Sequence, residues 1–302
     1  MKYFYIHPFK PQYFFPFEFR KHDLFLNFFN SYSFVGGVSW FLFKRFSVYR
    51  WFFSIKNIED YIPEHNIKKI IGNDSIMAFN KGTMGPEQKI TGLGVSNKNE
   101  FFFKYGQTKI AKVNVQNEYC ILKQIEHLDF VPKVINFYKD KNQVLLKTSV
   151  LKGNRLKYKV INNKIVDLLF LFSKQKVECN KTTSIKLQCS FAHGDFCPWN
   201  LMIHDGQILV FDWEMAGNFT LGYDLFTYIF QTQFLLNANI QINNIISDNI
   251  NAIKYYFSKF NIKNWKTYLT AFAKDKIRLE QLKGSKGLIN EYLILLDYSK
   301  KM

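Results

Sequence analysis

The sequence predicts an α+β protein of two lobes, the first built mainly on strands and the second mainly on helices. Its 302 residues suffice for two lobes with a core each, since single cores tend to stop growing near this size. Runs that favour β-structure dominate from residue 75 to 150, and apolar residues at helical spacing dominate beyond Gly153. We therefore expect an aromatic and basic N-terminal extension, an N-lobe and a helical C-lobe, at residues 1–74, 75–152 and 153–302.

The N-lobe is expected to contain five antiparallel strands and one helix. Turn-rich segments at 81–86 and 97–99 separate the first three strands, so an antiparallel meander is the simplest arrangement. The helix, Val113–Leu128, follows the third strand. The five strands are expected at Ser75–Asn80, Gln88–Ser96, Glu100–Tyr105, Val134–Tyr138 and Gln143–Val150.

The predicted helix of the N-lobe carries a carboxylate on its apolar side. Glu118 falls at helical spacing with Val115, Leu122 and Ile125. A carboxylate on a buried face needs a partner. Glu118 is therefore a candidate for a buried ion pair.

The C-lobe is expected to contain five helices and a β-hairpin. The hairpin joins Leu201–His204 to Gln207–Trp213 through Asp205-Gly206, a dipeptide that readily adopts the positive φ angles of a two-residue turn. The helices are expected at Ile165–Gln175, Asp224–Leu236, Ile245–Phe260, Trp265–Glu280 and Leu288–Tyr298.

The hairpin brings Asn200 and Asp212 close together at its open end. If residue 204 pairs with 207, Asn200 faces Phe211 and Asp212 is the next residue along. Strict alternation would point Asn200 and Asp212 to opposite faces of the hairpin. A shared site therefore requires the chain before Leu201 to leave the strand, or a slightly different turn, and Pro198 favours an irregular loop there.

The residues near the open end of the hairpin have side chains that can bind a metal ion and act on a hydroxyl group. Asn200 and Asp212 offer an amide and a carboxylate oxygen, hard ligands that suit Mg²⁺. Asp195 lies five residues before Asn200 in the same loop. It can accept the proton of a hydroxyl that attacks a phosphate, or orient that hydroxyl.

The order His193-x-Asp195, Asn200 and then Asp212 after an apolar strand resembles the aminoglycoside phosphotransferase and choline kinase family. Gly194 and Trp213 stand where protein kinases typically carry Arg and Phe. The resemblance covers roughly residues 75–228. It implies a two-lobed protein-kinase-like fold, ATP and Mg²⁺ as cofactors, Asp195 as the catalytic residue, and Asn200 and Asp212 as metal ligands.

The resemblance also implies nucleotide-binding residues in the N-lobe. Lys104 stands where the family has the strand lysine that binds nucleotide phosphates, and Glu118 where it has the helix glutamate that holds this lysine. Gly82 and Gly85 lie in the turn that would cover the phosphates. A solvent-facing strand lysine is the alternative for Lys104, and a two-glycine turn is common.

Two further residues near the motif have structural interpretations. By analogy, His193 anchors the loop instead of binding metal. Asp224 resembles the aspartate that braces the catalytic loop in this family, while a simple acid at a helix N-terminus is an equal alternative. Neither Asp224 nor Glu214 can be assigned to the metal site, or excluded from it, from the sequence.

The predicted function is transfer of the ATP γ-phosphate to a hydroxyl of a small molecule. The run from Asn80 to Thr91 is similar to kinase-like proteins associated with bacterial surface-polysaccharide synthesis, which suggests a sugar, an amino alcohol or a lipid-linked saccharide as acceptor. The alternatives are a catalytically inactive nucleotide-binding scaffold and a basic protein that binds membrane surfaces.

Charge and aromatic content bear on partners and location. The net charge of +17 favours anionic partners, without a specific nucleic acid being expected. Residues 1–56 hold 22 of the 55 aromatic residues and eight Lys or Arg against two acids. This segment either packs onto the catalytic body or contacts a membrane peripherally.

The compartment expected from the sequence is the cytoplasm, with the inner face of the membrane as the alternative site. The four cysteines show no C-x-x-C spacing, which favours a reducing compartment. The apolar stretch Leu24–Phe43 is interrupted by Asn, Ser and Gly, so it is not expected to span a membrane.

Overall fold

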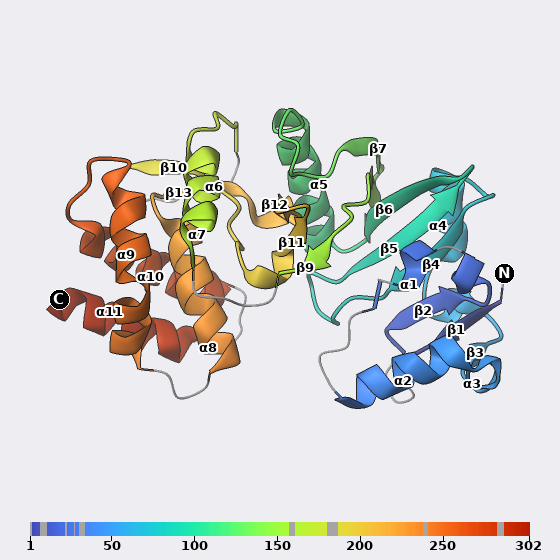
Figure 1. The fold of residues 1–302 in the computed structure, drawn as a ribbon. Coiled ribbons are helices and arrows are strands. Elements are labelled where there is room, and N and C mark those ends of the chain that lie inside the picture. The colour runs from blue at the N-terminus through green and yellow to red at the C-terminus, as the bar shows by residue number, and fades with distance from the viewer. Residues whose placement is uncertain are drawn as a thin grey trace. The chain divides into compact units, whose positions relative to one another are not determined.

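The computed structural model describes residues 2–6, 11–21, 23–26, 28–29, 34–156, 161–179, 187–237, 241–282 and 287–302. The chain forms two compact units (Figure 1). Unit 1 comprises Met1–Tyr119 and Pro132–Val150, and unit 2 comprises Cys120–Val131 and Leu151–Met302.

Unit 1 is organised around an eight-stranded antiparallel sheet with strand order β3-β1-β2-β4-β5-β6-β8-β7. The five expected strands are all present in the sheet. Their bounds are β4 Ile76–Asn80, β5 Lys89–Ser96, β6 Asn99–Gly106, β7 Val134–Lys139 and β8 Val144–Thr148. The other three strands come from the segment expected as an extension: β1 Tyr3–Tyr5, β2 Tyr13–Pro16 and β3 Ser54–Ile55.

The count of five strands was therefore too low, because the N-terminal segment continues the sheet. Strand β2 pairs with β4, with Phe14 opposite Phe79. Consecutive side chains of β1 and β2 enter different clusters, Tyr3 and Phe14 one, Phe4 and Phe15 the other. Side chains of a strand alternate between the two faces of the sheet, and here both faces are buried. The sequence of these strands is therefore almost entirely aromatic, without the alternation of apolar and polar residues that marks a strand with one exposed face.

Helices cover the sheet of unit 1 and connect its strands (Figure 1). The helix expected at Val113–Leu128 begins about one turn earlier, because Thr108 Oγ1 accepts a hydrogen bond from the N–H of Ala111 and caps it. The helical elements are η1 Phe19–Lys21, α1 Asp23–Leu26, α2 Phe34–Arg45, α3 Ser47–Phe52, η2 Ile58–Asp60, α4 Glu64–Ile71 and α5 Lys109–Gln124.

The hydroxyl of Tyr3 ties β1 to α4, and its removal should destabilise the fold. It donates a 2.6 Å hydrogen bond to Glu64, and burial raises the pKa of this hydroxyl. We expect Tyr3→Phe to lower the free energy of unfolding by about 1–3 kcal/mol, because a buried carboxylate loses a donor. Urea denaturation measures the change. Tyr5→Phe is the matched control, since within the described residues the Tyr5 hydroxyl makes no hydrogen bond; equal losses in both variants would contradict the prediction.

Unit 2 is mainly helical and carries two small antiparallel sheets. One sheet pairs β10 Cys189–Ala192 with β13 Gly217–Thr220, and the other has the order β12-β11-β9. The strands of the second sheet are β9 Asn154–Arg155, β11 Leu201–His204 and β12 Gln207–Val210.

The five expected helices of unit 2 are present with ends shifted by up to three residues. The helix expected at Asp224–Leu236 contains a π-helical turn, η5, between two α-helical parts. The helical elements are α6 Asn163–Ser173, η3 Pro198–Asn200, η4 Trp213–Met215, α7 Tyr223–Phe226, η5 Thr227–Gln231, α8 Thr232–Leu236, α9 Ile242–Ser258, α10 Trp265–Leu282 and α11 Ile289–Lys301.

Across the described residues, every helix is too short or too polar to cross a bilayer.

Candidate active site

The hairpin β11–β12 has the register expected from the sequence. His204 pairs with Gln207 and Leu201 with Val210. Asp205 and Gly206 both have positive φ angles, 47° and 78°, as a two-residue turn of this kind requires. The turn therefore fixes which residues meet at the open end of the hairpin.

Asn200 and Asp212 both lie outside the strands, which removes the conflict over faces. Asn200 ends the short helix η3, and Asp212 follows β12 in the left-handed region at φ 69°. The backbone N–H of Phe211 still donates to the carbonyl of Asn200, so the two segments stay side by side. Because the backbone is irregular at both positions, the two side chains are not forced to point to opposite faces of the hairpin.

The carboxylate of Asp195 is held by two side-chain amides. Asn200 Nδ2 donates to Asp195 Oδ2 at 3.0 Å and also to its backbone carbonyl at 2.8 Å. Gln231 Nε2 donates to the other carboxylate oxygen, Oδ1, at 2.8 Å. Asp195 therefore enters any reaction with its orientation already fixed.

Asn200 is oriented by the same contacts. Because its Nδ2 points at Asp195, its side-chain oxygen lies on the opposite side of the amide. The carboxylates of Asp212 and Glu214 can each place an oxygen within 4.8 Å of the other. Unit 2 thus offers hard oxygen atoms next to the loop that carries Asp195.

His193 is a buried anchor of this loop. Its Nδ1 accepts the N–H of Asp195 at 3.3 Å, and its Nε2 lies 3.0 Å from the carbonyl of Phe211. These partners make Nε2 the protonated nitrogen, because a carbonyl only accepts. The ring packs edge to face on the buried Trp213, 4.8 Å between centroids. Both ring nitrogens are occupied by the backbone, so His193 holds the loop against the segment after β12.

Asp224 braces the start of the loop. It is the second residue of α7, and its two carboxylate oxygens accept the N–H groups of His193 and Gly194 at 2.6 and 2.9 Å. Burial raises the pKa of this carboxyl, although His193 and the two N–H groups act against that shift. Both sequence interpretations of Asp224 hold, since it begins a helix and also ties that helix to the loop.

Glycine is required at position 194 by geometry. Its φ is +85°, and a Cβ there would lie 2.2 Å from the carbonyl oxygen of Met215. An arginine, as protein kinases typically carry here, would need the loop to move away from η4. Gly194 therefore sets the close packing between the loop and the segment that carries Asp212.

Three residues around the loop escaped the sequence analysis. Gln231 follows a mainly apolar run after Asp224, a signal that could have singled it out. Lys276 of α10 donates to Gln231 Oε1 at 2.8 Å. Arg155 of β9 donates to the carbonyl of Trp199 at 2.6 Å and lies over the ring of Phe211, the residues that directly precede Asn200 and Asp212 in the sequence.

In unit 1 the structure brings Lys104 and Glu118 together. Lys104 lies in β6 between Thr91 of β5 and Leu146 of β8, and its Nζ is 2.5 Å from the carboxylate of Glu118 on α5. Only 5 % of Lys104 and 3 % of Glu118 is exposed, so a solvent-facing lysine is excluded. Glu118 has the buried partner that its position on the apolar face demanded.

Gly82 and Gly85 lie in the connection between β4 and β5. The N–H of Gly82 donates to Asn80 Oδ1 at 2.9 Å, and the N–H of Gln88 donates to the carbonyl of Gly85 at 3.0 Å. At φ +73° a Cβ on Gly82 would meet the carbonyl oxygen of Lys89 at 2.4 Å. The turn is closely packed around Gly82, whereas a Cβ on Gly85 would have no neighbouring atom within 4 Å.

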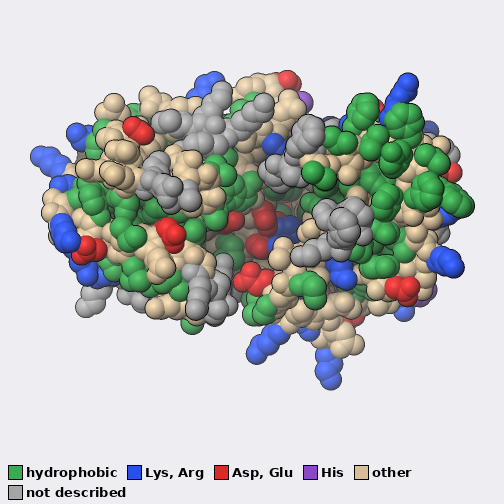
Figure 2. Space-filling model, turned by 90° about the horizontal axis from the view of Figure 1, so that it is seen from below, with side chains coloured by type: hydrophobic (Ala, Val, Ile, Leu, Met, Phe, Trp, Pro, Cys, Tyr) green, Lys and Arg blue, Asp and Glu red, His purple; other side chains and the backbone are tan. Residues whose placement is uncertain are grey.

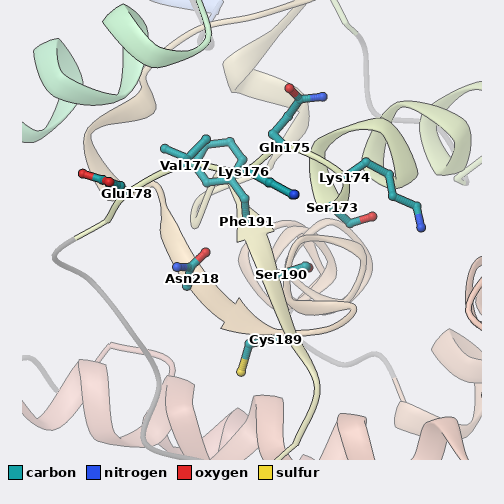
Figure 3. A pocket seen from close by; sticks show the side chains of 10 residues that line it. All are labelled: Ser173, Lys174, Gln175, Lys176, Val177, Glu178, Cys189, Ser190, Phe191 and Asn218. Carbon is teal, nitrogen blue, oxygen red and sulfur yellow. The ribbon is translucent and has the colours of Figure 1, made fainter.

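A pocket of about 530 Å³ lies elsewhere in unit 2 (Figure 3). Its side chains come from the end of α6, from residues 174–178, from β10 and from Asn218 of β13. None of the candidate catalytic or metal-binding residues lines it. The pocket is therefore separate from the chemistry of the loop.

The comparison with family models agrees with the loop geometry. Residues 180–241 match the phosphotransferase enzyme family, and this segment contains Asp195, Asn200, Asp212 and Asp224. No curated protein matches the chain.

Solved structures match over most of the chain. Amicoumacin kinase in complex with AMP-PNP, Ca²⁺ and Ami is 10 % identical, with 81 % of this chain and 94 % of that chain covered and a TM-score of 0.52. Aminoglycoside phosphotransferase APH(4)-Ia is 9 % identical, with 80 % and 97 % covered and a TM-score of 0.52. A thermostable mutant of it, in a ternary complex with ADP and hygromycin B, has a TM-score of 0.51, 9 % identity and 79 % and 97 % coverage. At these identities the likeness shows the fold alone.

The fold and the loop together define the class of this protein. It has the protein-kinase-like fold of small-molecule phosphotransferases, as the sequence resemblance implied. Residues 180–241, which contain Asp195, Asn200 and Asp212, are similar to the phosphotransferase enzyme family. The expectation of a kinase-like phosphotransferase is confirmed.

Proposed function

We propose that this chain transfers the γ-phosphate of ATP to a hydroxyl group of a small molecule, with Asp195 as the catalytic residue. The observation that carries the proposal is the arrangement of Asp195. Two amides hold its carboxylate. The backbone of its loop is held by Asp224, which accepts the N–H of His193, and by the His193 ring, which accepts the N–H of Asp195. Phosphoryl transfer depends mainly on such positioning and on stabilisation of charge.

Asp195 acts on the acceptor hydroxyl. It accepts a hydrogen bond from that hydroxyl, orients its oxygen toward the γ-phosphorus and takes the proton as the new bond to phosphorus forms. Asn200 keeps the carboxylate turned toward the acceptor through its Nδ2. The resulting products are ADP and the phosphorylated acceptor.

The residues near the loop fit a divalent cation, which we propose to be Mg²⁺. Asn200 and Asp212 would hold it, and Glu214 is close enough to Asp212 to assist. The donor set consists of oxygen atoms alone, which Mg²⁺ prefers over nitrogen or sulfur. When bound, such an ion neutralises negative charge on the nucleotide phosphates.

We assign nucleotide binding in unit 1 to Lys104. The ammonium group would contact the phosphates of ATP, and Glu118 keeps it from turning away. Gly82 and Gly85 would let the β4–β5 connection approach the phosphates closely.

The proposed acceptors are sugars, amino alcohols and lipid-linked saccharides. The protein-kinase-like structures that resemble this chain include a complex with hygromycin B, which supports a polyhydroxylated acceptor. The high content of basic residues would also favour an acceptor that carries negative charge.

The decisive experiment measures formation of ADP from ATP and Mg²⁺ with glucose, ethanolamine, hygromycin B and a lipid-linked saccharide as acceptors. We expect ADP release above the background with at least one class of acceptor, and its loss when EDTA removes the cation. Asp212→Asn should abolish the metal-dependent activity while it preserves the left-handed backbone that Asn tolerates well. Binding of Mg²⁺ and ATP without transfer to any acceptor would favour the scaffold, and failure to bind them would refute the proposal.

A second candidate function is peripheral contact of residues 1–56 with an anionic membrane surface. Helices α2 and α3 and the residue that joins them, Phe46, present eight of the 21 large apolar side chains that are exposed among the described residues: Val35, Val38, Phe41, Phe46, Val48, Tyr49, Trp51 and Phe52. Figure 2 shows hydrophobic side chains gathered over the part of the view that holds unit 1. Residues 34–57 contain four Lys or Arg and no acid, which complements anionic lipid headgroups.

Vesicle flotation tests this contact. The protein should float with vesicles of phosphatidylcholine and phosphatidylglycerol more than with phosphatidylcholine alone, and Trp51→Ser with Phe52→Ser should abolish flotation. Leu293→Ser with Ile294→Ser is the matched control, because these exposed apolar side chains lie on α11. Self-association in sedimentation without flotation would instead show that the α2–α3 surface binds a second copy of the chain.

A further inference from the structure

Gln231 connects the proposed catalytic carboxylate to the C-terminal helices. It is the last residue of η5, the π-helical turn between α7 and α8. Its Nε2 donates to Asp195 Oδ1 at 2.8 Å, a contact between residues 36 positions apart. π-helical turns are rare and often occur at functional sites. The helix thus meets the catalytic loop twice, through Asp224 near its start and through Gln231.

The orientation of the Gln231 amide is fixed from the opposite side. Its Oε1 accepts hydrogen bonds from Lys276 Nζ of α10 at 2.8 Å and from the hydroxyl of Tyr292 of α11 at 3.4 Å. Both donors are buried. A flipped amide would turn its NH₂ group toward an ammonium and a hydroxyl and its oxygen toward a carboxylate. Nε2 also donates to Cys197 Sγ at 3.5 Å, and only the observed orientation satisfies all four partners.

This arrangement restrains both oxygens of Asp195 from different elements. Gln231 holds Oδ1 and Asn200 holds Oδ2, and Asn200 belongs to the loop itself. If Gln231 were absent, the carboxylate would keep only partners from the loop itself, Asn200 on Oδ2 and the long 3.8 Å contact from Cys197 Sγ on Oδ1, and could rotate about its Cβ–Cγ bond. A small rotation matters because a misplacement of about 1 Å can cost on the order of a hundredfold in rate.

We propose that Gln231 is a positioning residue for Asp195, and that Lys276 acts on the same carboxylate only through Gln231. The inference rests on the proposed role of Asp195. It makes α10 and α11, the helices that follow the phosphotransferase segment in sequence, part of what orients the catalytic carboxylate. Lys276 contributes by fixing the amide through its 2.8 Å hydrogen bond to Gln231 Oε1.

Steady-state hydrolysis of ATP, with water as the acceptor and Mg²⁺ present, tests this role. We expect Gln231→Met to lower kcat by about ten- to a hundredfold, while KM for ATP stays within about twofold because no contact to the nucleotide changes. Gln233→Met is the matched control on the same helix and should keep kcat within about twofold. An unchanged kcat in Gln231→Met would overturn the proposal.

The charge variant separates positioning from structural support. In Gln231→Glu the new carboxylate can still accept from Lys276 and Tyr292 but cannot donate to Asp195. We expect Tm to stay near that of the wild type while kcat falls at least as far as in Gln231→Met. If Gln231→Glu restored kcat, the side chain would serve only to bind the C-terminal helices.

A double-mutant cycle tests the relay through Lys276. We expect Lys276→Met to lower kcat in the wild-type background and to have no further effect in the Gln231→Met background, because the path to Asp195 is already broken. Independent, multiplicative effects would overturn the relay. Tyr292→Phe, which removes a single hydroxyl, replaces Lys276→Met if that variant does not fold.

A measurement without turnover distinguishes this inference from the proposed function. The side-chain amide resonances of ¹⁵N-glutamine-labelled protein that disappear in Gln231→Met belong to Gln231. They should shift in Asp195→Asn, which alters their acceptor, and an unshifted pair would refute the contact. Absence of phosphate release and of transfer to every acceptor in the wild type would instead count against the proposed role of Asp195.

Discussion

Asp195→Asn should lower the rate of phosphoryl transfer by about 10²–10⁴-fold and leave the binding of AMP-PNP nearly unchanged. The range is that expected for loss of a positioned general base. An asparagine cannot take the proton of the acceptor hydroxyl. Its NH₂ group would also face the NH₂ groups of Asn200 or Gln231, both of which now donate to the carboxylate.

The rate is measured as kcat for the acceptor with the highest turnover, and binding as the Kd of AMP-PNP with Mg²⁺. Asp205→Asn is the matched control, because Asp205 lies in the exposed hairpin turn of the same segment and its positive φ suits Asn equally well. An Asp195→Asn variant with more than a tenth of the wild-type kcat would remove Asp195 from the catalytic role.

Lys104→Met should lower the free energy of unfolding by about 3–5 kcal/mol. It leaves Glu118 as a buried carboxylate without the ammonium that now lies 2.5 Å away, and such a charge is costly. The double variant Lys104→Met with Glu118→Leu should recover most of this loss, since apolar side chains of similar volume replace a buried pair at little cost. Under the proposed function both variants bind ATP weakly.

Urea denaturation of both variants measures these changes. The control pair is Lys123 in the last turn of α5 and Glu126 just beyond that helix; it has a similar distance of 2.6 Å but is about half exposed. Lys123→Met should cost less than about 1 kcal/mol, because solvent screens an exposed pair. Equal losses from Lys104→Met and Lys123→Met would show that burial of the first pair does not matter for stability.

Local sequence was sufficient where a short segment determines its own geometry. Asp205-Gly206 set the hairpin register, because both residues readily adopt positive φ. The two strands that flank this turn are equally long, so they pair residue by residue outward from it. The position of Glu118 on the apolar face of its helix predicted a buried partner for its carboxylate, and that partner is Lys104.

The N-terminal strands could not be recognised in the same way. Tyr3, Phe4, Phe14 and Phe15 are all buried, and their alternation between the two faces of the sheet becomes visible only when both covering layers are known. The sequence of residues 1–56 therefore suggested an aromatic extension, whereas the sheet of unit 1 includes three strands from residues 1–74.

The sequence by itself determined the class of chemistry, since Asp195, Asn200 and Asp212 lie in one short stretch whose spacing depends on local turns. The tertiary structure decided how Asp195 is held. Its contact to Gln231 closes a loop of 36 residues, and Gln231 is in turn fixed by Lys276 and Tyr292, which lie 45 and 61 positions further on. Contacts over such separations arise from the packing of α7, α10 and α11 against the loop, and no local pattern of residues encodes them.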